Sequence, residues 1–366
     1  MRLLAYDKNT DSYALTDVDI STLEDTRKLS GSATVLRAGL ALTLDYGKGS
    51  VNWDQKDGPV SFTATEQGGV LIPDSFDSLA MASIYYNMEL SYLFFCDEMG
   101  IDGATLRRLP TYYKPKIVIK ENEKEPYQMM DNAFYMQISD TERGFFIVPF
   151  EIFQWVPIAL NTGILTHEYT HYVFDILFKD NIPTLDAKSE NFLRAFNEAT
   201  ADFMAVARTE DPDFMAPSIP PTLFVAEKCN GLSGMELSRD ISDPITQNYN
   251  SIMDYWAREI EDTNAFCPYE IGLLLAGIFY EIAIGLDEVN GDIEDTPSKE
   301  SLILVAGRLM DTLDGLAESV SKTEDFELWD MFSELVAQFD NNTERAVVCS
   351  VIEARYEIYF SEVIGC

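Results

Sequence analysis

Histidine and basic residues are scarce in this chain. Only two histidines occur among 366 residues, and 26 Lys and Arg stand against 62 Asp and Glu, for a formal net charge of −36. Nucleic acids and anionic membrane surfaces carry negative charge themselves, so we expect neither as a partner. The charge permits basic substrates, and it equally suits solubility in a salty or extracellular medium. Because 46% of the residues are hydrophobic, the chain can still bury a large core.

A long apolar segment is also missing. The best candidate, residues 272–286, is interrupted by Glu281, so we expect no membrane span. The N-terminal residues Met1 to Asp7 are not followed by the apolar stretch of a secretory leader. The protein is therefore predicted to be either cytoplasmic or a mature form that has lost its leader. We favour the mature form, which would be secreted or periplasmic.

The five cysteines form no C-x-x-C pair, which argues against a zinc site built from thiolates. In an oxidising compartment Cys229 could bridge to Cys267, and Cys349 to Cys366. Cys96 would then remain in an apolar stretch. The odd count by itself does not decide between a reducing and an oxidising location.

The two histidines lie four residues apart in the pattern H-E-x-x-H, as His167, Glu168 and His171. Positions i and i+4 share one face of an α-helix, about 5–6 Å apart at Cβ, so two imidazoles placed in this way can bind one Zn²⁺. Glu168 is then next to the first ligand, where it can act as a general base on a water molecule. The pattern predicts a zinc hydrolase.

A second acidic helix could complete this site. Apolar residues repeat at helical spacing from Phe192 to Val206, and Glu198 and Asp202 are four residues apart within that stretch. Glu198 would be the third ligand, and Asp202 would accept the ring N–H of a histidine ligand and fix its tautomer. In a chain this acidic the pair could also be an ordinary solvated helix face, but its combination with the histidine motif favours the metal site.

Together these motifs resemble the gluzincins, and most closely the thermolysin-like metalloendopeptidases. The likeness covers roughly residues 76–285 and keeps the order of four family motifs. In the family they read N-A-F-W, H-E-L-T-H with a following Asp, N-E-A-x-S-D and R-S-M-S-D-P. In this chain they correspond to Asn132-Ala133-Phe134-Tyr135, to His167-Glu168-Tyr169-Thr170-His171 with Asp175, to Asn197-Glu198-Ala199-Thr200-Ala201-Asp202, and to Arg239-Asp240-Ile241-Ser242-Asp243-Pro244.

The resemblance implies one Zn²⁺ per chain and a peptide or protein substrate. His167, His171 and Glu198 would be the metal ligands, with Asn197 and Asp202 supporting them. An extended peptide would add to the strand that begins at residue 132, where Asn132 and the backbone of Ala133 would hold the substrate chain. Arg239 would donate to the carbonyl of the residue after the scissile bond.

The chain also departs from the family. Relatives use a late histidine to stabilise the oxyanion, and its position corresponds here to Tyr269, which could donate from its phenol or simply be a buried aromatic. The family's tyrosine between the second histidine and the glutamate has no counterpart, since Tyr172 comes too early. Calcium is possible but not supported, because the acidic cluster at 210–213 reads better as a solvated turn and its upstream partner corresponds to Gly163.

The pattern of elements predicts an α+β fold of the thermolysin-like zincin type. We expect a strand-rich segment over 1–75, a mixed lobe with the substrate-binding edge over 76–162, and a helical lobe with the zinc site over 163–366. The active-site helix would lie between the two lobes. The expected elements are short strands and turns before residue 73, including an alternating run over 60–65, helices at 76–98, 163–178, 302–316 and 328–339, and strands at 116–120, 133–138 and 145–150 with the last two antiparallel.

The predicted function is a zinc metalloendopeptidase with Glu168 as the general base. The alternative is a protein of the gluzincin fold that binds peptides or a partner but hydrolyses weakly, an interpretation suggested by the missing histidine and tyrosine. The presence of Glu168 argues against that alternative, because a binding protein needs no general base at this position.

Overall fold

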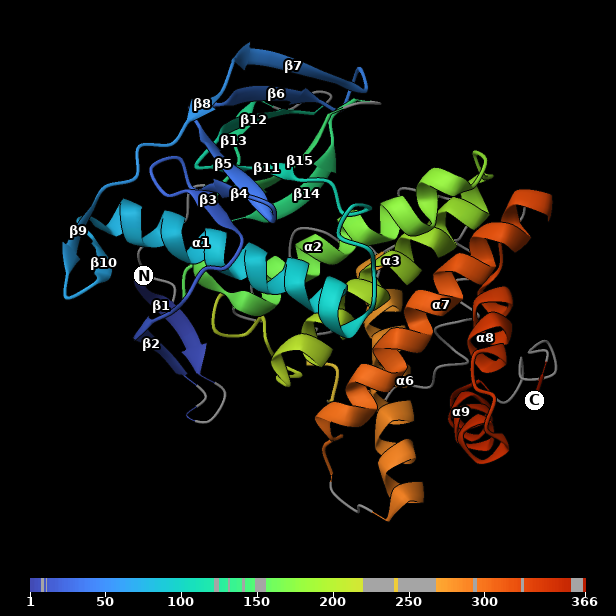
Figure 1. Ribbon diagram of the computed structural model, residues 1–366. Coiled ribbons are helices and arrows are strands. Elements are labelled where there is room, and N and C mark those ends of the chain that lie inside the picture. The colour runs from blue at the N-terminus through green and yellow to red at the C-terminus, as the bar shows by residue number, and fades with distance from the viewer. Residues whose placement is uncertain are drawn as a thin grey trace. The chain divides into compact units, whose positions relative to one another are not determined.

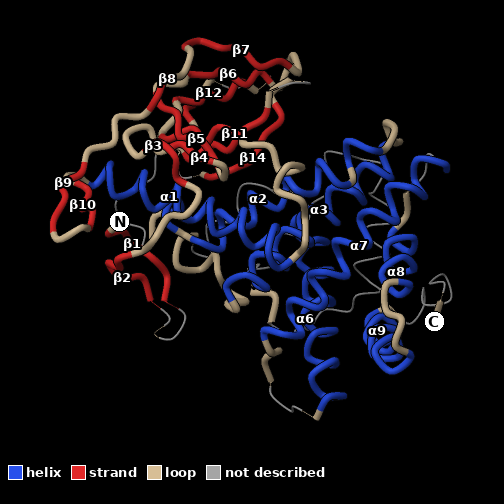
Figure 2. Tube along the Cα trace, in the orientation of Figure 1, coloured by secondary structure: helices blue, strands red, loops and turns tan. Residues whose placement is uncertain are grey.

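The computed structural model describes residues 1–7, 10, 12–121, 125–130, 132–139, 142–148, 156–219, 240–242, 268–291, 295–323, 326–356 and 365–366 (Figure 1). Its contacts divide the chain into two units, Met1–Tyr169 with Pro217–Ile219, and Thr170–Ala216 with Pro220–Cys366. The strands belong to the first unit, and the second is built from helices (Figure 2). The predicted α+β class, with a strand-rich N-terminal and a helical C-terminal region, is confirmed. The finer division at residues 75 and 162 stays a prediction.

The larger sheet of the first unit is mixed. Its strands follow the order β14-β15-β11-β5-β4-β3, and β8 pairs with β5. Strand β11 is parallel to both β5 and β15, whereas β14 and β15 are antiparallel, as predicted. The strand bounds are β3 Leu23–Asp25, β4 Ser30–Gly31, β5 Thr34–Ala38, β8 Gly58–Pro59, β11 Leu109–Tyr113, β14 Ala133–Gln137 and β15 Arg143–Ile147.

A second, four-stranded sheet has the order β13-β12-β6-β7. Its strands are β6 Ala41–Asp45, β7 Ser50–Gln55, β12 Lys116–Lys120 and β13 Tyr127–Gln128. Residues 116–120 form the strand predicted from the sequence. Apolar side chains of β6 and β12, such as Leu42 and Ile117, share one buried core cluster with Tyr112 of β11 and Phe146 of β15. Successive side chains of a strand point to opposite faces, and the inward-facing side chains of both sheets pack into this common core.

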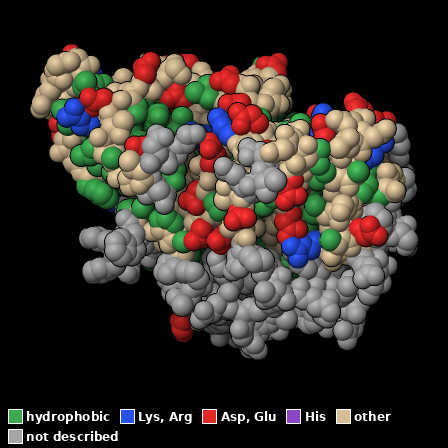
Figure 3. Space-filling view, turned by 90° about the horizontal axis from the view of Figure 1, so that it is seen from below, with side chains coloured by type: hydrophobic (Ala, Val, Ile, Leu, Met, Phe, Trp, Pro, Cys, Tyr) green, Lys and Arg blue, Asp and Glu red, His purple; other side chains and the backbone are tan. Residues whose placement is uncertain are grey.

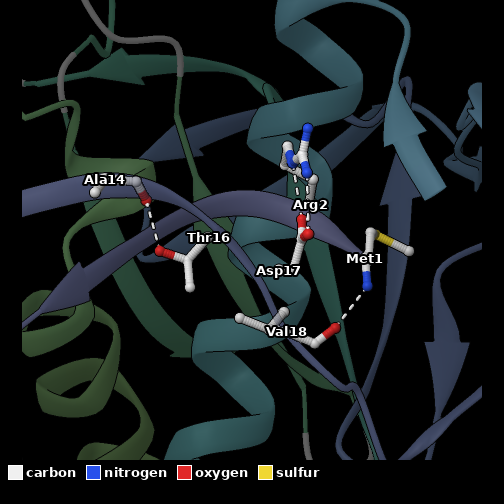
Figure 4. A network of polar contacts seen from close by, with 6 residues as sticks. All are labelled: Met1, Arg2, Ala14, Thr16, Asp17 and Val18. Carbon is white, nitrogen blue, oxygen red and sulfur yellow. Dashed lines mark hydrogen bonds and ion pairs between the residues drawn. The ribbon is translucent and has the colours of Figure 1, made fainter. Parts of the chain in front are cut away.

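Two hairpins complete the strand-rich unit, β1 Arg2–Asp7 with β2 Ser12–Asp17 and β9 Ala64–Gln67 with β10 Val70–Pro73. In the first hairpin the Met1 amine donates to the Val18 carbonyl, and Arg2 Nε donates to Asp17 Oδ1 at 2.8 Å (Figure 4). The alternation at 60–65 predicts a strand over the whole run. Only its last two residues, in β9, belong to a strand, because the preceding segment pairs with no described strand.

Helix α1, Phe76–Leu93, continues through a π-helical turn at Phe94–Glu98, which confirms the predicted helix over 76–98. It begins where the sequence places a cap, since the Ser75 side chain accepts a hydrogen bond from the backbone amide of Ser78 at 3.1 Å. Its buried face mixes aromatic residues such as Tyr85 with polar ones such as Asn87. The polar residues carry contacts to the next long helix of the chain.

The helical unit contains the C-terminal part of α2 and five further helices among the described residues: α3 Ala187–Thr209, α6 Pro268–Asn290, α7 Lys299–Thr323, α8 Leu328–Ala337 and α9 Asn342–Arg355. The predicted helices at 302–316 and 328–339 correspond to α7 and α8. Edge-to-face ring pairs join the helices, among them Phe174 with Phe196 and Phe203 with Phe279. Such pairs favour specific orientations of the packed helices.

The disulfide Cys349–Cys366 is present, as predicted, and Cys96 is a free thiol. The other predicted pair, Cys229–Cys267, lies outside the described residues. None of the described helices combines the length and the apolar character that a membrane crossing needs. Carboxylate side chains are scattered over the described part of the face in Figure 3, where basic side chains are sparse, in keeping with the net charge of −36.

Candidate metal centre

Helix α2, Thr162–Leu177, carries the histidine motif and nearly coincides with the predicted helix over 163–178. The residue before it, Asn161, caps the helix, since its Oδ1 accepts a hydrogen bond from the amide of Ile164 at 3.0 Å. The motif then occupies the second and third turns. This placement puts His167 and His171 one turn apart on one face, as the spacing predicted.

Polar contacts from α1 hold the first turns of α2. Thr162 Oγ1 donates to Asn87 Oδ1 at 3.0 Å, and the Ser91 and Thr166 hydroxyl groups lie 3.1 Å apart. All four residues are buried. Because Thr166 directly precedes His167, this network fixes the backbone that presents the first histidine. Buried hydrogen bonds of this kind specify one arrangement of two helices, because breaking one leaves a desolvated polar group.

The side chains of His167, His171 and Glu198 converge. One potential ligand atom from each residue lies within 4.8 Å of the other two. His171 Nε2 and Glu198 Oε1 are 3.9 Å apart, too far for a hydrogen bond. Two donors bound to one Zn²⁺ at about 2.0–2.2 Å are separated by about 3.4 Å in a tetrahedral site and by at most about 4.3 Å. The 3.9 Å between His171 and Glu198 lies within this range, and the 4.8 Å bound on the whole set lies slightly above it.

These residues are largely shielded from solvent. His167 is 3% exposed, and the side chains of His171 and Glu198 are 14% and 15% exposed. The donor atoms of the three residues all lie within 4.8 Å of one another. Among the described residues this is the one group of three or more His, Cys, Asp or Glu for which that holds. The donor chemistry of two imidazoles and one carboxylate suits zinc.

Asn197 sets the orientation of one imidazole. Its Oδ1 lies 2.9 Å from His171 Nδ1. Since an amide oxygen can only accept, Nδ1 is the donor of this hydrogen bond, and in the neutral imidazole Nε2 then keeps its lone pair on the side of Glu198. A partner of this kind raises the basicity of a ligand histidine and fixes its tautomer. Asp202, predicted to do the same for a histidine, is fully buried one turn beyond Glu198 on α3, and its role stays a prediction.

Glu168 is tied to the predicted substrate strand. The backbone amide of Tyr135, in β14, donates to Glu168 Oε2 at 2.8 Å, and Glu168 is 8% exposed. No sequence pattern indicates this contact, because almost every residue has a backbone N–H group and the residue type does not show which one will donate. It orients the carboxylate and leaves it next to the strand rather than in bulk solvent.

The register of β14 shows which way its backbone groups point. The amide of Val148 donates to the carbonyl of Asn132, so Asn132 is turned toward β15. Backbone groups alternate along an antiparallel strand, so Ala133 and Tyr135 are turned away from β15. Among the described strands β14 pairs only with β15. The backbone of Ala133, predicted to bind substrate, therefore shares its open side with the amide that binds Glu168.

The remaining predicted residues are less closely defined. Tyr269 is the second residue of α6 and is partly exposed, and its role as an oxyanion donor stays a prediction. Arg239 lies outside the described residues. The Asn132 side chain lies 3.7 Å from the Met129 sulfur. Tyr172 is buried in α2 at 2% exposure.

The acidic cluster after α3 forms a turn. Glu210 ends α3 with a left-handed backbone conformation at φ 60°, and Asp211 Oδ1 accepts from the amide of Asp213 at 3.0 Å. Burial, followed by the nearby charges of Asp240 and Asp211, raises the pKa of Asp213 to about 6. A bound cation would act in the opposite direction. The predicted turn is present, and the expectation that it binds no calcium stays a prediction.

No family model matches the sequence, and comparison with curated proteins finds no significant similarity.

Proposed function

We propose that this protein is a zinc-dependent metalloendopeptidase related to the thermolysin-like gluzincins. The observation that carries the proposal is the convergence of His167, His171 and Glu198, with Glu168 on the same helix as the two histidines. Both histidines of the chain are used in this cluster. A chance pairing of unrelated surface residues would not account for their burial or for the support from Asn197.

The three side chains fit a catalytic rather than a structural zinc site, because three protein ligands leave a fourth position open. When bound, Zn²⁺ supplies Lewis-acid polarisation of the scissile carbonyl and lowers the pKa of water. The protein contributes a preformed donor set, with the Nε2 lone pair of His171 directed by the hydrogen bond from Nδ1 to Asn197.

Glu168 acts as the general base in this proposal. Its carboxylate removes a proton from the attacking water and passes the proton to the nitrogen of the leaving amine. The hydrogen bond from the Tyr135 amide holds the carboxylate in place during both transfers. A positioned base of this kind contributes about 10²- to 10⁴-fold to the rate.

The substrate is an extended peptide that pairs with the open side of β14. The backbone groups of Ala133 face that side, next to the amide that binds Glu168, so the peptide would run past the general base. Asn132 and Arg239 are proposed as further substrate contacts, and the Tyr269 phenol as the oxyanion donor. The Cys349–Cys366 disulfide favours an oxidising location, and we propose that the protein acts as a secreted or periplasmic enzyme.

Digestion of a fluorescent peptide library by the zinc-loaded protein, with and without a zinc chelator, tests the function. We expect cleavage that the chelator abolishes and that added zinc restores. Binding of peptides without cleavage would instead support the weakly hydrolysing binding protein. Cleavage that persists in a His167→Ala/His171→Ala variant would show that the activity comes from elsewhere.

A further inference from the structure

Helix α6 packs tightly against α3 at Gly272, where its nearest neighbours are Glu198 and the backbone of Ala195 and Ala199. A Cβ atom added to Gly272 would lie 2.7 Å from Glu198 Cβ, 3.1 Å from the Ala195 carbonyl oxygen and 3.2 Å from the Ala199 amide nitrogen. Real Cβ atoms essentially never approach another heavy atom within 3.0 Å. None of these three atoms is at the flexible end of a side chain, so the contact can be relieved only by moving a helix or turning the root of Glu198.

Neighbouring contacts restrain α3 at this point. The Phe196 ring packs on Phe174 at 5.5 Å, and the Phe203 ring packs on Phe279 of α6 at 5.8 Å. These two aromatic residues flank Glu198 in the sequence, and both are fully buried. Because α3 is restrained on both sides, strain introduced at residue 272 would fall on Glu198 or on the spacing between the two helices.

We propose that Gly272 is a positioning residue for the Glu198 carboxylate. The absence of a side chain lets α6 rest against the Cβ of Glu198 and limits where its carboxylate can go. A glycine inside a helix is less favourable than alanine, and the close approach that Gly272 allows offsets this cost. This inference rests on the proposed zinc site, to which Glu198 contributes its one carboxylate ligand.

Two other glycines of α6 supply matched controls. At Gly277 an added Cβ would meet its nearest atom, the Ile241 carbonyl oxygen, at 3.5 Å, which is an ordinary contact. At Gly285 it would meet Val347 Cγ1 at 2.6 Å, a clash with the end of a side chain on α9. Glycine-to-alanine substitution on α6 thus covers three cases. It gives no clash at Gly277, a clash away from Glu198 at Gly285, and a clash with Glu198 at Gly272.

The test measures zinc affinity by chelator competition, together with thermal unfolding of the zinc-free protein, for Gly272→Ala, Gly277→Ala and Gly285→Ala. We expect Gly272→Ala to lose about 10- to 100-fold in zinc affinity, the range found when the surroundings of a ligand are altered. Gly277→Ala and Gly285→Ala should keep the wild-type affinity, whatever their midpoints of unfolding. Wild-type affinity in Gly272→Ala, or an equal loss in Gly285→Ala, would overturn the proposal.

The wild-type protein separates this inference from the proposed function. If the wild type binds no zinc, the proposed function fails and this inference fails with it. If the wild type binds zinc and Gly272→Ala binds equally well, only the role of Gly272 is refuted. If Gly272→Ala does not fold, the double variant Gly272→Ala/Glu198→Gly can be made. It removes the Cβ of residue 198, with which the new alanine side chain would clash. Recovery of folding would support the contact, and continued failure would assign the clash to the α3 backbone and overturn the proposal.

Discussion

The backbone amide of Tyr135 and the carboxylate of Glu168 are joined by a 2.8 Å hydrogen bond. The contact links a strand that could pair with a peptide to the residue that would accept a proton from water. A single helix also carries Glu168 and both histidines. Substrate alignment and proton transfer would therefore depend on the same few residues.

The first prediction concerns the metal. Purified wild-type protein should contain about one zinc per chain, because the donor atoms of three proposed ligands lie close together. His171→Ala should contain far less, since it loses both a ligand and the partner of Asn197. Elemental analysis of both proteins, purified in the same buffer, measures the difference. Equal zinc contents would show that the metal is bound elsewhere.

The general base gives a second prediction. Glu168→Gln keeps the size of the side chain and can still accept a hydrogen bond from Tyr135, but an amide does not take up a proton at neutral pH. We expect unchanged zinc content and a loss of about 10²- to 10⁴-fold in turnover on a peptide substrate. Turnover at the wild-type rate would rule out Glu168 as the base.

Asn197 is the subject of the third prediction. Asn197→Ala removes the acceptor for His171 Nδ1 and should weaken zinc binding by about 10- to 100-fold. Asn197→Asp retains an acceptor oxygen and should bind zinc nearly as well as the wild type. Chelator competition compares the three proteins. If the alanine variant matched the wild type, the hydrogen bond to Asn197 would have no part in presenting the histidine.

A fourth prediction tests the oxyanion donor. A phenol ordinarily keeps its proton to about pH 10 and can donate a hydrogen bond throughout the neutral range. Tyr269→Phe should then lower turnover by about 10²-fold with little change in zinc content. Steady-state kinetics on a good peptide substrate, with Tyr280→Phe as a comparison, provide the measurement. Unchanged turnover in Tyr269→Phe would leave Tyr269 as a packed aromatic residue.

The fifth prediction is a pH dependence of stability. Because the pKa of Asp213 is raised to about 6 in the folded protein, from an ordinary value of 3.8, the folded state binds a proton more tightly than the unfolded state. The free energy of unfolding should therefore fall as pH rises from about 4 to about 6. Asp213→Asn cannot ionise and should unfold at a higher temperature than the wild type at pH 7, but not below pH 4. Stabilisation of the wild type alone by added calcium would instead indicate a cation at this turn.

Local rules predicted much of this structure. The strand at 116–120 was predicted from the sequence, and Ser75 marked the start of α1. The spacing of His167 and His171 required a helix, and α2 supplies it. Each of these features depends on residues within a turn or two of one another, so the sequence pattern alone is sufficient.

Several features that depend on distant residues were not predicted. The parallel pairing of β11 with β5 joins Leu109 to Thr34, and no local pattern specifies such a partner. The contact of the Tyr135 amide with Glu168 uses a backbone group that every residue except proline has. The closeness of Gly272 to Glu198 arises only when α6 packs on α3. The run at 60–65 failed for the same reason, since alternation predicts a strand but not whether a neighbour is available to pair with it.

The bond between Cys349 and Cys366 has a consequence for the proposed peptidase activity. A single cut between these two cysteines would leave the released piece covalently attached to α9. Self-digestion in that segment would go unnoticed on a gel run without a reducing agent and would become visible only after reduction. Comparing the two gels after prolonged incubation at high protein concentration would therefore reveal nicks that the unreduced gel conceals.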